Sequence, residues 1–309
     1  MKTKILRILF FSSFVLLLMI SINLDHQNIY NQKALNMIHY KLSDSLGIQR
    51  LTNVKIALID EDISNESLVN FIKLYKNQAG KRYSHGTMIA NLLGARYDTN
   101  TGYQGLLPNI TLYGYSIPTN EMNTSSLTEA ITCVTNWNID IICISMGTNK
   151  ENVDLKNAIL NTVHHGIVVI CSSGNNPYDT NYPASFPIPG VISIGAIGND
   201  YNILPYTNVN SQVDIYAPGE NIVSLTDNSS KVMAYSGTSV AVPFVTLACI
   251  YIKAFSPSLN PAEVEDFLIQ QTDSYLANWG NDQREIRVLN MKHLMKSLNI
   301  IQESEKENF

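Results

Sequence analysis

Four residues carry the side chains that acyl-transfer chemistry needs, and they occur in the order Asp60, His85, Asn175 and Ser239. Each has an ordinary explanation when taken alone. Asp60 follows an apolar run and Asn175 lies in the stretch Ser-Gly-Asn-Asn, and both positions are typical of turns. His85 and Ser239 each stand where a helix is expected to begin, which is typical of capping residues.

Together the four residues predict a serine acyl-transfer site. A serine hydroxyl is too weak an acid to attack an amide at neutral pH, so a base must take its proton. Histidine has a suitable pKa and can return the proton to the leaving amine, while a carboxylate orients the ring and stabilises its charged form. A serine at a helix N-terminus adds its backbone N–H and the helix dipole to an oxyanion site, and Asn175 would donate a second hydrogen bond.

Short apolar runs alternate with helical patterns along the chain. The runs predict buried strands over 54–59, 110–115, 139–145, 167–171, 191–196 and 213–216, and helices are predicted over 31–48, 85–93, 125–137, 154–165, 239–255 and from 260 onward. This alternation predicts a three-layer, doubly wound α/β fold with a mostly parallel sheet and helices on both faces. Ligands bind beyond the carboxyl ends of such strands, where Asp60, residues 145–147 and residues 172–175 are expected.

Longer motifs surround these residues. Ser84–Ala90 and Gly237–Pro243 resemble the histidine and serine motifs of subtilisin-like serine proteases, the subtilases. Ile56–Asp60 resembles their aspartate motif and Ser173–Asn175 their oxyanion segment. The resemblance runs from about residue 51 to residue 298 and implies a serine endopeptidase of subtilisin type.

The resemblance also implies a role for each residue. Asp60 would orient the imidazole, His85 would act as general base and acid, Ser239 would be the nucleophile, and Asn175 would be the oxyanion donor. An extended peptide or protein substrate would add as a strand beside the backbone. The implied substrate-binding residues are Ser125, Ser126, Leu127, Ser145, Met146, Gly147, Ser172, Ser173 and Gly174, the last three lining the first specificity pocket.

The chain departs from the subtilase pattern directly after Asp60. The family has a small residue and then glycine there, whereas this chain has Glu61 and Asp62. Aspartate tolerates left-handed backbone better than most residues but less easily than glycine, so the turn is expected to be strained or rebuilt. This departure leaves open a catalytically silent subtilase fold that only binds peptides. The added carboxylates either favour basic substrate residues or form a solvated acidic turn.

The N-terminus has the pattern of an export signal. Lys2, Lys4 and Arg7 precede an apolar run over residues 8–24, which predicts membrane insertion with the charged end inside the cell. No A-x-A cleavage site follows, so residues 1–24 are predicted as a signal peptide or as an uncleaved signal-anchor helix, with a buried core helix as the alternative. The protein is therefore expected outside the cytoplasm, secreted or anchored, with membrane contact only through this segment.

The remaining chain is expected to form one peptidase domain over residues 25–300, followed by a polar tail over 301–309. Residues 25–59 leave no room for the usual folding propeptide in addition to the first helix and strand. Small extracytoplasmic subtilases that remove leader peptides from lantibiotic precursors fit this profile, so a dedicated precursor peptide is the expected substrate. The alternative is a broad secreted degradative subtilase.

Composition and cysteines narrow the remaining possibilities. The balance of 21 basic to 26 acidic residues gives no electrostatic reason to bind nucleic acid, and 45% hydrophobic residues exclude wholesale disorder. Four cysteines lie in apolar runs without CxxC spacing and are predicted to be buried free thiols, with a disulfide between neighbouring strands as the alternative. They are Cys133, Cys143, Cys171 and Cys249.

No cofactor is required for the predicted chemistry. Calcium is common among subtilases, and the stretch 96–102 offers oxygen ligands, so Asp98 and Asn100 are weak candidates for a structural calcium site. An ordinary turn is the alternative for this stretch.

Overall fold

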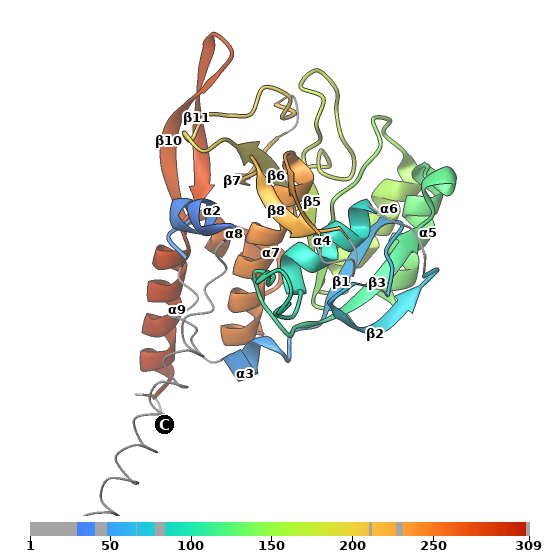
Figure 1. Cartoon of the computed structure of the whole chain (residues 1–309), viewed down its shortest axis with the longest axis horizontal. Coiled ribbons are helices and arrows are strands. Elements are labelled where there is room, and N and C mark those ends of the chain that lie inside the picture. Colours follow the sequence, from blue (N-terminus) through green and yellow to red (C-terminus); the bar gives the residue numbers. More distant parts are fainter. Residues whose placement is uncertain are drawn as a thin grey trace, which may run out of the picture.

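The computed structural model describes residues 30–40, 48–65, 67–77, 84–209, 212–226 and 231–306, with side chains up to residue 298. The expected N-terminal signal or anchor, residues 1–24, lies outside the described residues. Within them, the main sheet has nine strands in the order β10-β11-β7-β6-β5-β4-β1-β3-β2 (Figure 1). Its strands are β1 (Ile56–Glu61), β2 (Asn70–Tyr75), β3 (Thr111–Ile117), β4 (Ile141–Ile144), β5 (Val168–Ser172), β6 (Val191–Ile197), β7 (Ile215–Pro218), β10 (Thr272–Trp279) and β11 (Asp282–Leu289).

The central strands are short apolar segments covered on both faces. Every residue of β4, β5 and β6 is buried, as expected for parallel strands between two helical layers. Among the described strand pairs of this sheet, β10 and β11 pair antiparallel and the others parallel. The predicted three-layer, mostly parallel α/β fold is confirmed.

Two helical layers enclose the sheet (Figure 1). On one face, α4 (His85–Gly94) and α7 (Thr238–Phe255) pack on each other and on the central strands, with α8 (Pro261–Ile269) and α9 (Met291–Lys306) beside them. On the other face, α5 (Thr124–Thr135) and α6 (Val153–His164) pack together. Helix α7 is long and apolar enough to cross a membrane, but 89% of it is buried inside the fold, so it is a central core helix.

The N-terminal helix is shorter than predicted. Instead of one helix over 31–48, the structure has α2 (Gln32–Met37) and α3 (Ile48–Leu51), and residues 41–47 lie outside the described part. The first helix ends at Met37, and His39 two residues later adopts a left-handed backbone with φ +53°. A residue in that conformation cannot continue a right-handed helix.

Several elements were not predicted. They are the edge strand β2, the small antiparallel pair β8 (Ile222–Leu225) and β9 (Val232–Tyr235), the short 3-10 turn η2 (Thr119–Glu121), and the hairpin β10–β11, which extends from the body in Figure 1. Helix α9 continues through residues 301–306, which the sequence analysis assigned to a polar tail.

The four cysteines are free. Cys143 on β4 and Cys171 on β5 lie on neighbouring strands, but their residues are offset by one in the register, with Cys143 opposite Ile170. Adjacent positions along a strand point to opposite faces, and the two thiols belong to different hydrophobic clusters on the two sides of the sheet. The alternative of a disulfide between neighbouring strands is therefore wrong for this pair.

Candidate active site

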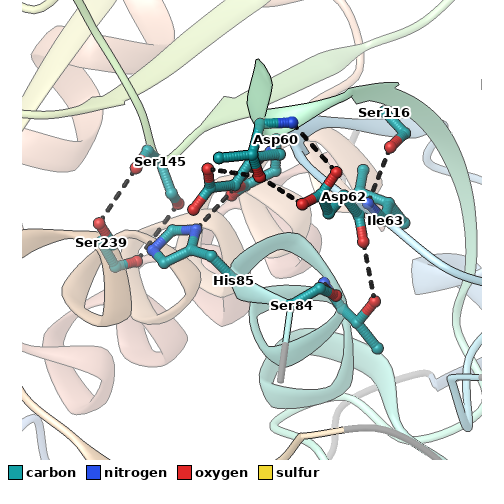
Figure 2. Close-up of polar contacts among 11 residues, drawn as sticks. Asp60, Asp62, Ile63, Ser84, His85, Ser116, Ser145 and Ser239 are labelled. Atoms are coloured by element: carbon teal, nitrogen blue, oxygen red, sulfur yellow. Dashed lines mark hydrogen bonds and ion pairs between the residues drawn. The ribbon is translucent and has the colours of Figure 1, made fainter. Parts of the chain in front are cut away.

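The carboxyl ends of β5, β4 and β1 lie side by side at one edge of the sheet, and α4 and α7 begin at the same edge. This arrangement brings together Asp60 at the end of β1, His85 at the start of α4 and Ser239 in the first turn of α7 (Figure 2). The predicted segments 145–147 and 172–175 follow β4 and β5 directly. The fold therefore collects the residues that the sequence singled out for chemistry.

Asp60 and His85 form a short hydrogen bond. The Nδ1–H of His85 donates to Oδ1 of Asp60 at 2.7 Å, and the backbone N–H of Glu61 donates to the same oxygen at 2.7 Å. Asp60 is fully buried, and within the described residues its second oxygen, Oδ2, has no hydrogen-bond partner. A buried carboxylate bonded to Nδ1 leaves Nε2 of the ring as the nitrogen that can accept a proton.

The start of α4 is built to hold His85 against β1. Ser84 caps the helix, because its side chain accepts the backbone N–H of Thr87 at 3.3 Å. Gly86 allows close approach, since a Cβ at that position would lie 2.5 Å from the carbonyl oxygen of Glu61. The residue after His85 must therefore be glycine for the ring to reach Asp60.

The pKa of His85 is raised above its ordinary value of 6.5. Burial of the ring lowers this pKa, but the charge of Asp60, the hydrogen bond to Asp60 and the charge of Glu61 raise it and outweigh burial. The environment therefore stabilises the imidazolium, which is the form that a general base adopts after taking a proton.

Ser239 is the second residue of α7 and does not cap the helix, because the N-cap position is Gly237. Its hydroxyl donates to the carbonyl oxygen of Ser145 at 3.0 Å, and the hydroxyl of Ser145 donates to the carbonyl oxygen of Ser239 at 3.3 Å. Figure 2 shows the ring of His85 between Asp60 and Ser239. Within the described residues no hydrogen bond joins Ser239 to His85. The Ser239 hydroxyl donates its hydrogen bond to the carbonyl oxygen of Ser145 instead.

Asn175 lies against the N-terminus of α7. Its Oδ1 accepts the backbone N–H of Thr238 at 2.9 Å and the Thr238 hydroxyl at 3.1 Å. These two hydrogen bonds identify the atom of the Asn175 amide that faces Thr238 as the oxygen, so the Nδ2 group faces away from Thr238. The side chain is exposed, and in the described part of the chain Nδ2 donates no hydrogen bond, which leaves it available to a ligand oxygen. The sequence did not predict the contact with Thr238, although Thr238 precedes Ser239 in the serine motif.

The expected strand-like pairing of Ser125, Ser126 and Leu127 with substrate is wrong. These residues form the first turn of α5, where Asn123 and Ser126 make a reciprocal capping box. A helix uses its backbone groups for its own hydrogen bonds and cannot pair with an extended peptide. The segment 119–123, which precedes α5 at the same edge, is exposed, and part of its backbone is engaged in the short turn η2.

The predicted segments 145–147 and 172–174 are separated by the side chain of Asn181. Its Nδ2 donates to the carbonyl oxygen of Ser172 at 2.8 Å. A Cβ on Gly147 would lie 2.4 Å from Asn181 Oδ1, and a Cβ on Gly174 would lie 3.0 Å from Asn181 Cβ. Ser145, Met146, Ser172 and Ser173 are themselves buried, so a ligand would meet chiefly the backbone here. The amide of Asn181 therefore fills the space between the two segments.

The expected calcium stretch forms a self-contained turn. Oδ1 of Asp98 accepts the backbone N–H of Asn100 at 3.2 Å, and Oδ2 accepts the backbone N–H and hydroxyl of Thr101 at 3.2 and 2.5 Å. Calcium takes 6–8 oxygen ligands, whereas this turn offers one carboxylate that is already engaged. The described residues contain no group of three His, Cys, Asp or Glu side chains that could hold a metal ion. Calcium binding at Asp98 and Asn100 stays a prediction.

Comparisons with known proteins agree with this geometry. The family model of the subtilase family matches residues 51–291. The chain is 30% identical over 246 residues to the major intracellular serine protease of Bacillus subtilis, covering 71% of this chain and 76% of that protein. It is 30% identical over 241 residues to subtilisin NAT of Bacillus subtilis subsp. natto, covering 74% of this chain and 62% of that protein, less than two thirds of its length.

A solved structure shows the same fold. The structure of the prenylagaramide maturation protease PagA superimposes with a TM-score of 0.66 and 20% sequence identity. The match covers 82% of this chain and 99% of PagA. At this identity the likeness supports the fold of the whole described body.

Proposed function

Because this chain belongs to the subtilase family and is a serine endopeptidase, we propose that Asp60, His85 and Ser239 form its catalytic triad. The single observation that carries the proposal is the 2.7 Å hydrogen bond between the buried Asp60 and His85, beside the first turn of the helix that holds Ser239. No cofactor is needed for this chemistry.

The reaction starts when Nε2 of His85 takes the hydroxyl proton of Ser239 as the oxygen attacks the peptide carbonyl. Asp60 stabilises the imidazolium that forms. The developing oxyanion accepts hydrogen bonds from Nδ2 of Asn175 and from the backbone N–H of Ser239, which lies in the first turn of α7. His85 then gives its proton to the amine, which leaves the acyl-enzyme. Water takes the place of the amine and gives a proton to His85 as it attacks the acyl carbon, and the proton then returns to Ser239 as the carboxylic acid product leaves.

The first step requires a change in the hydroxyl of Ser239. In the unliganded protein it donates to the carbonyl oxygen of Ser145. A rotation about χ1 redirects it to Nε2 of His85, and catalytic hydrogen bonds often tighten only in the substrate complex. The two hydrogen bonds between Ser145 and Ser239 thus hold the nucleophile in a resting state, and the bond from the Ser239 hydroxyl must break before the reaction starts.

The substrate is a peptide or protein in extended conformation. We place it beside the exposed segment 119–123, and main-chain hydrogen bonds to the backbone of residues 145–147 provide affinity. The side chain that precedes the cleaved bond enters between residues 145–147 and 172–174, next to Asn181. Because Asn181 occupies part of this space, the pocket is small and polar.

A processing role on a dedicated precursor peptide is the finer proposal. It is supported by the match to PagA, which is named a maturation protease, and by the small polar pocket, which restricts the substrates accepted. Broad degradation is the alternative, because the name of subtilisin NAT, another match, specifies no precursor substrate. Turnover of casein and of a single co-encoded precursor peptide, compared under the same conditions, distinguishes the two roles.

Export is a further part of the proposal. It is supported by the basic residues 2–7 and the apolar run 8–24, which have the pattern of a signal or anchor. N-terminal sequencing of protein recovered outside the cytoplasm tests it, because a signal peptide is removed and an anchor is retained. Recovery of all protein from the cytosol would contradict export.

The decisive experiment for the triad is covalent labelling with a fluorophosphonate probe. The wild-type protein should label at one site, and Ser239→Ala should abolish labelling and lower turnover by about a millionfold. Ser258→Ala, an exposed serine on the loop before α8, is the matched control and should label normally. Labelling that persists in Ser239→Ala rejects this nucleophile, and folded wild-type protein that never labels indicates a silent peptide-binding fold.

A further inference from the structure

The turn after the proposed catalytic aspartate is stabilised by the side chain of Asp62. Asp62 has a left-handed backbone with φ +49°, a conformation that is less favourable for aspartate than for glycine. Its side chain is not solvated, because the residue is only 7% exposed. The left-handed backbone and the buried carboxylate of Asp62 are both unfavourable, so favourable contacts of this residue must offset their free-energy cost.

Hydrogen bonds to Thr119 supply that compensation. Oδ1 of Asp62 accepts the backbone N–H of Thr119 at 3.1 Å, and Oδ2 accepts the Thr119 hydroxyl in a short hydrogen bond. The backbone of Asp62 is held as well, since its N–H donates to the carbonyl oxygen of Ile117 at 3.0 Å and its carbonyl accepts the hydroxyl of Thr87 at 3.4 Å. One residue thus connects the end of β1 with the end of β3 and with α4.

We propose that Asp62 is a positioning residue that locks the turn carrying Asp60 to Thr119, the first residue of the exposed segment 119–123. This inference rests on the proposed function, in which Asp60 orients His85 and segment 119–123 borders the substrate. A glycine at position 62 would adopt the backbone conformation at little cost but could make neither side-chain bond to Thr119. The carboxylate therefore couples the catalytic turn to the substrate-binding edge.

The orientation of Asp60 depends on this turn. Its Oδ1 accepts the backbone N–H of Glu61, the residue between Asp60 and Asp62, so a shift of the turn moves that donor directly. Oδ2 of Asp60 has no partner within the described residues that could hold the carboxylate independently. The hydroxyl of Thr119 also lies 3.4 Å from Oε2 of Glu61, which places both acidic side chains of the turn against the same residue.

Asp62→Asn and Asp62→Gly separate the hydrogen bonds from the charge. Both variants remove the negative charge, and both asparagine and glycine tolerate left-handed backbone. Only asparagine retains an oxygen that can accept the N–H of Thr119. We expect Asp62→Gly to lower kcat/KM about tenfold and to move the acid limb of its pH profile to lower pH, because a displaced Asp60 raises the pKa of His85 less. Asp62→Asn should stay within about threefold of wild type.

Thr119→Val tests whether Asp62 acts through Thr119. It removes the hydroxyl without changing the backbone bond, and we expect about a threefold loss of kcat/KM. In the double variant Asp62→Gly, Thr119→Val, the loss should stay close to that of Asp62→Gly alone, because the second substitution then removes only the long 3.4 Å contact between the Thr119 hydroxyl and Oε2 of Glu61. Melting temperatures of all variants check folding, and Thr119→Val decides the question if Asp62→Gly does not fold.

Two failures are distinguishable. If the wild-type protein does not label with fluorophosphonate, the proposed function fails. If the wild type is active but Asp62→Gly and Thr119→Val keep both its kcat/KM and its acid limb, the positioning role is overturned and the contact serves stability alone. Additive losses in the double variant overturn the coupling through Thr119.

Discussion

Oδ1 of Asn175 accepts the backbone N–H of Thr238 at 2.9 Å, which turns the amide NH₂ of Asn175 away from α7 and leaves it without a hydrogen-bond partner among the described residues. This orientation predicts that Asn175 acts as a donor in the transition state only. Asn175→Ala should lower kcat by about 10²–10³ with little change in KM, the loss known for the corresponding donor of subtilisin. Steady-state kinetics on one peptide substrate measures kcat and KM separately and so tests this expectation.

Asn175→Asp is the sharper variant at this position. It keeps the shape of the side chain and can still accept the N–H of Thr238, but it offers a negative oxygen where a donor is needed. We expect a larger loss of kcat than in Asn175→Ala. In a competition assay, substrate should protect the variant from fluorophosphonate labelling as well as it protects the wild type, because access to the pocket is unchanged. A kcat in either variant close to that of wild type would exclude Asn175 from the oxyanion site.

Asp60→Asn should uncouple His85 from its orienting charge. The amide can occupy the same volume, but it removes the coulombic interaction and the charged hydrogen bond that raise the pKa of His85. The pKa of His85 should therefore fall, and kcat should drop by about 10⁴, because the ring is no longer held in the required tautomer. NMR titration of His85 and single-turnover kinetics check the two effects separately. A kcat above a tenth of wild type would contradict the assigned role.

Much of the sheet could be predicted because its central strands are apolar runs buried on both faces, as in β4 and β5. The edge strand β2 (Asn70–Tyr75) mixes exposed and half-buried residues, and the β10–β11 hairpin carries exposed charged residues, so neither gives a continuous apolar signal. In the N-terminal segment the expected helix ends early, at a left-handed residue that no local pattern marks.

The site residues could be predicted as a set because motifs in a fixed order identify strand ends and helix starts. The bonds between them could not, since they depend on the register of distant segments. Asp62 and Thr119, for example, are 57 residues apart and meet only because β1 and β3 pair with Glu61 opposite Ile117. The sequence predicts a helix over 125–137, yet residues 125–127 are also expected to line an extended substrate; the structure resolves this conflict with a capping box of Asn123 and Ser126 that begins the helix.

Glu61→Gln should make the enzyme more active in acid. The charge of Glu61 contributes to the raised pKa of His85, so its removal lowers that pKa and leaves more of the ring as free base at low pH. The acid limb of kcat/KM should move to lower pH, by less than in Asp60→Asn, because Glu61 is partly exposed and water screens its charge. Glu285→Gln, on the distant strand β11, should leave the profile unchanged. A limb that stays in place or moves upward would contradict the prediction.

Glu265→Gln should remove a pH dependence of stability. Glu265 and Asp214 line a cavity of about 470 Å³ between α8 and the loop that precedes β6. Burial, together with the charges of Asp214 and Asp266, raises the pKa of Glu265 to about 7, although the hydrogen bond from the N–H of Gly190 lowers it. Burial also raises the pKa of Asp214 to about 6, against the N–H of Ser193 and the charge of Arg287.

A carboxyl whose pKa is raised by folding stabilises the protein while protonated, and that stability is lost as the pH rises through the folded pKa. The free energy of unfolding should therefore fall between about pH 4.5 and pH 7, the ordinary and folded pKa values of Glu265. The change should be on the order of 1 kcal/mol, because solvent screens these partly exposed groups. Urea unfolding at a series of pH values should show a flatter profile for Glu265→Gln than for wild type. A wild-type stability that rises across this window would contradict the assignment.

Asn181→Gly should widen the specificity pocket. A Cβ on Gly147 would lie 2.4 Å from Oδ1 of Asn181, and the amide of Asn181 donates to the carbonyl of Ser172, so this side chain occupies the space that a large substrate side chain would need. The wild-type enzyme should therefore cleave after alanine or serine in preference to phenylalanine. Glycine removes the amide and opens the space, so the kcat/KM ratio of phenylalanine to alanine substrates should rise at least about tenfold. Asn136→Gly, at the C-cap of α5, is the matched control and should leave the ratio unchanged. A wild-type preference for phenylalanine, or a ratio that Asn181→Gly does not alter, would place the pocket elsewhere.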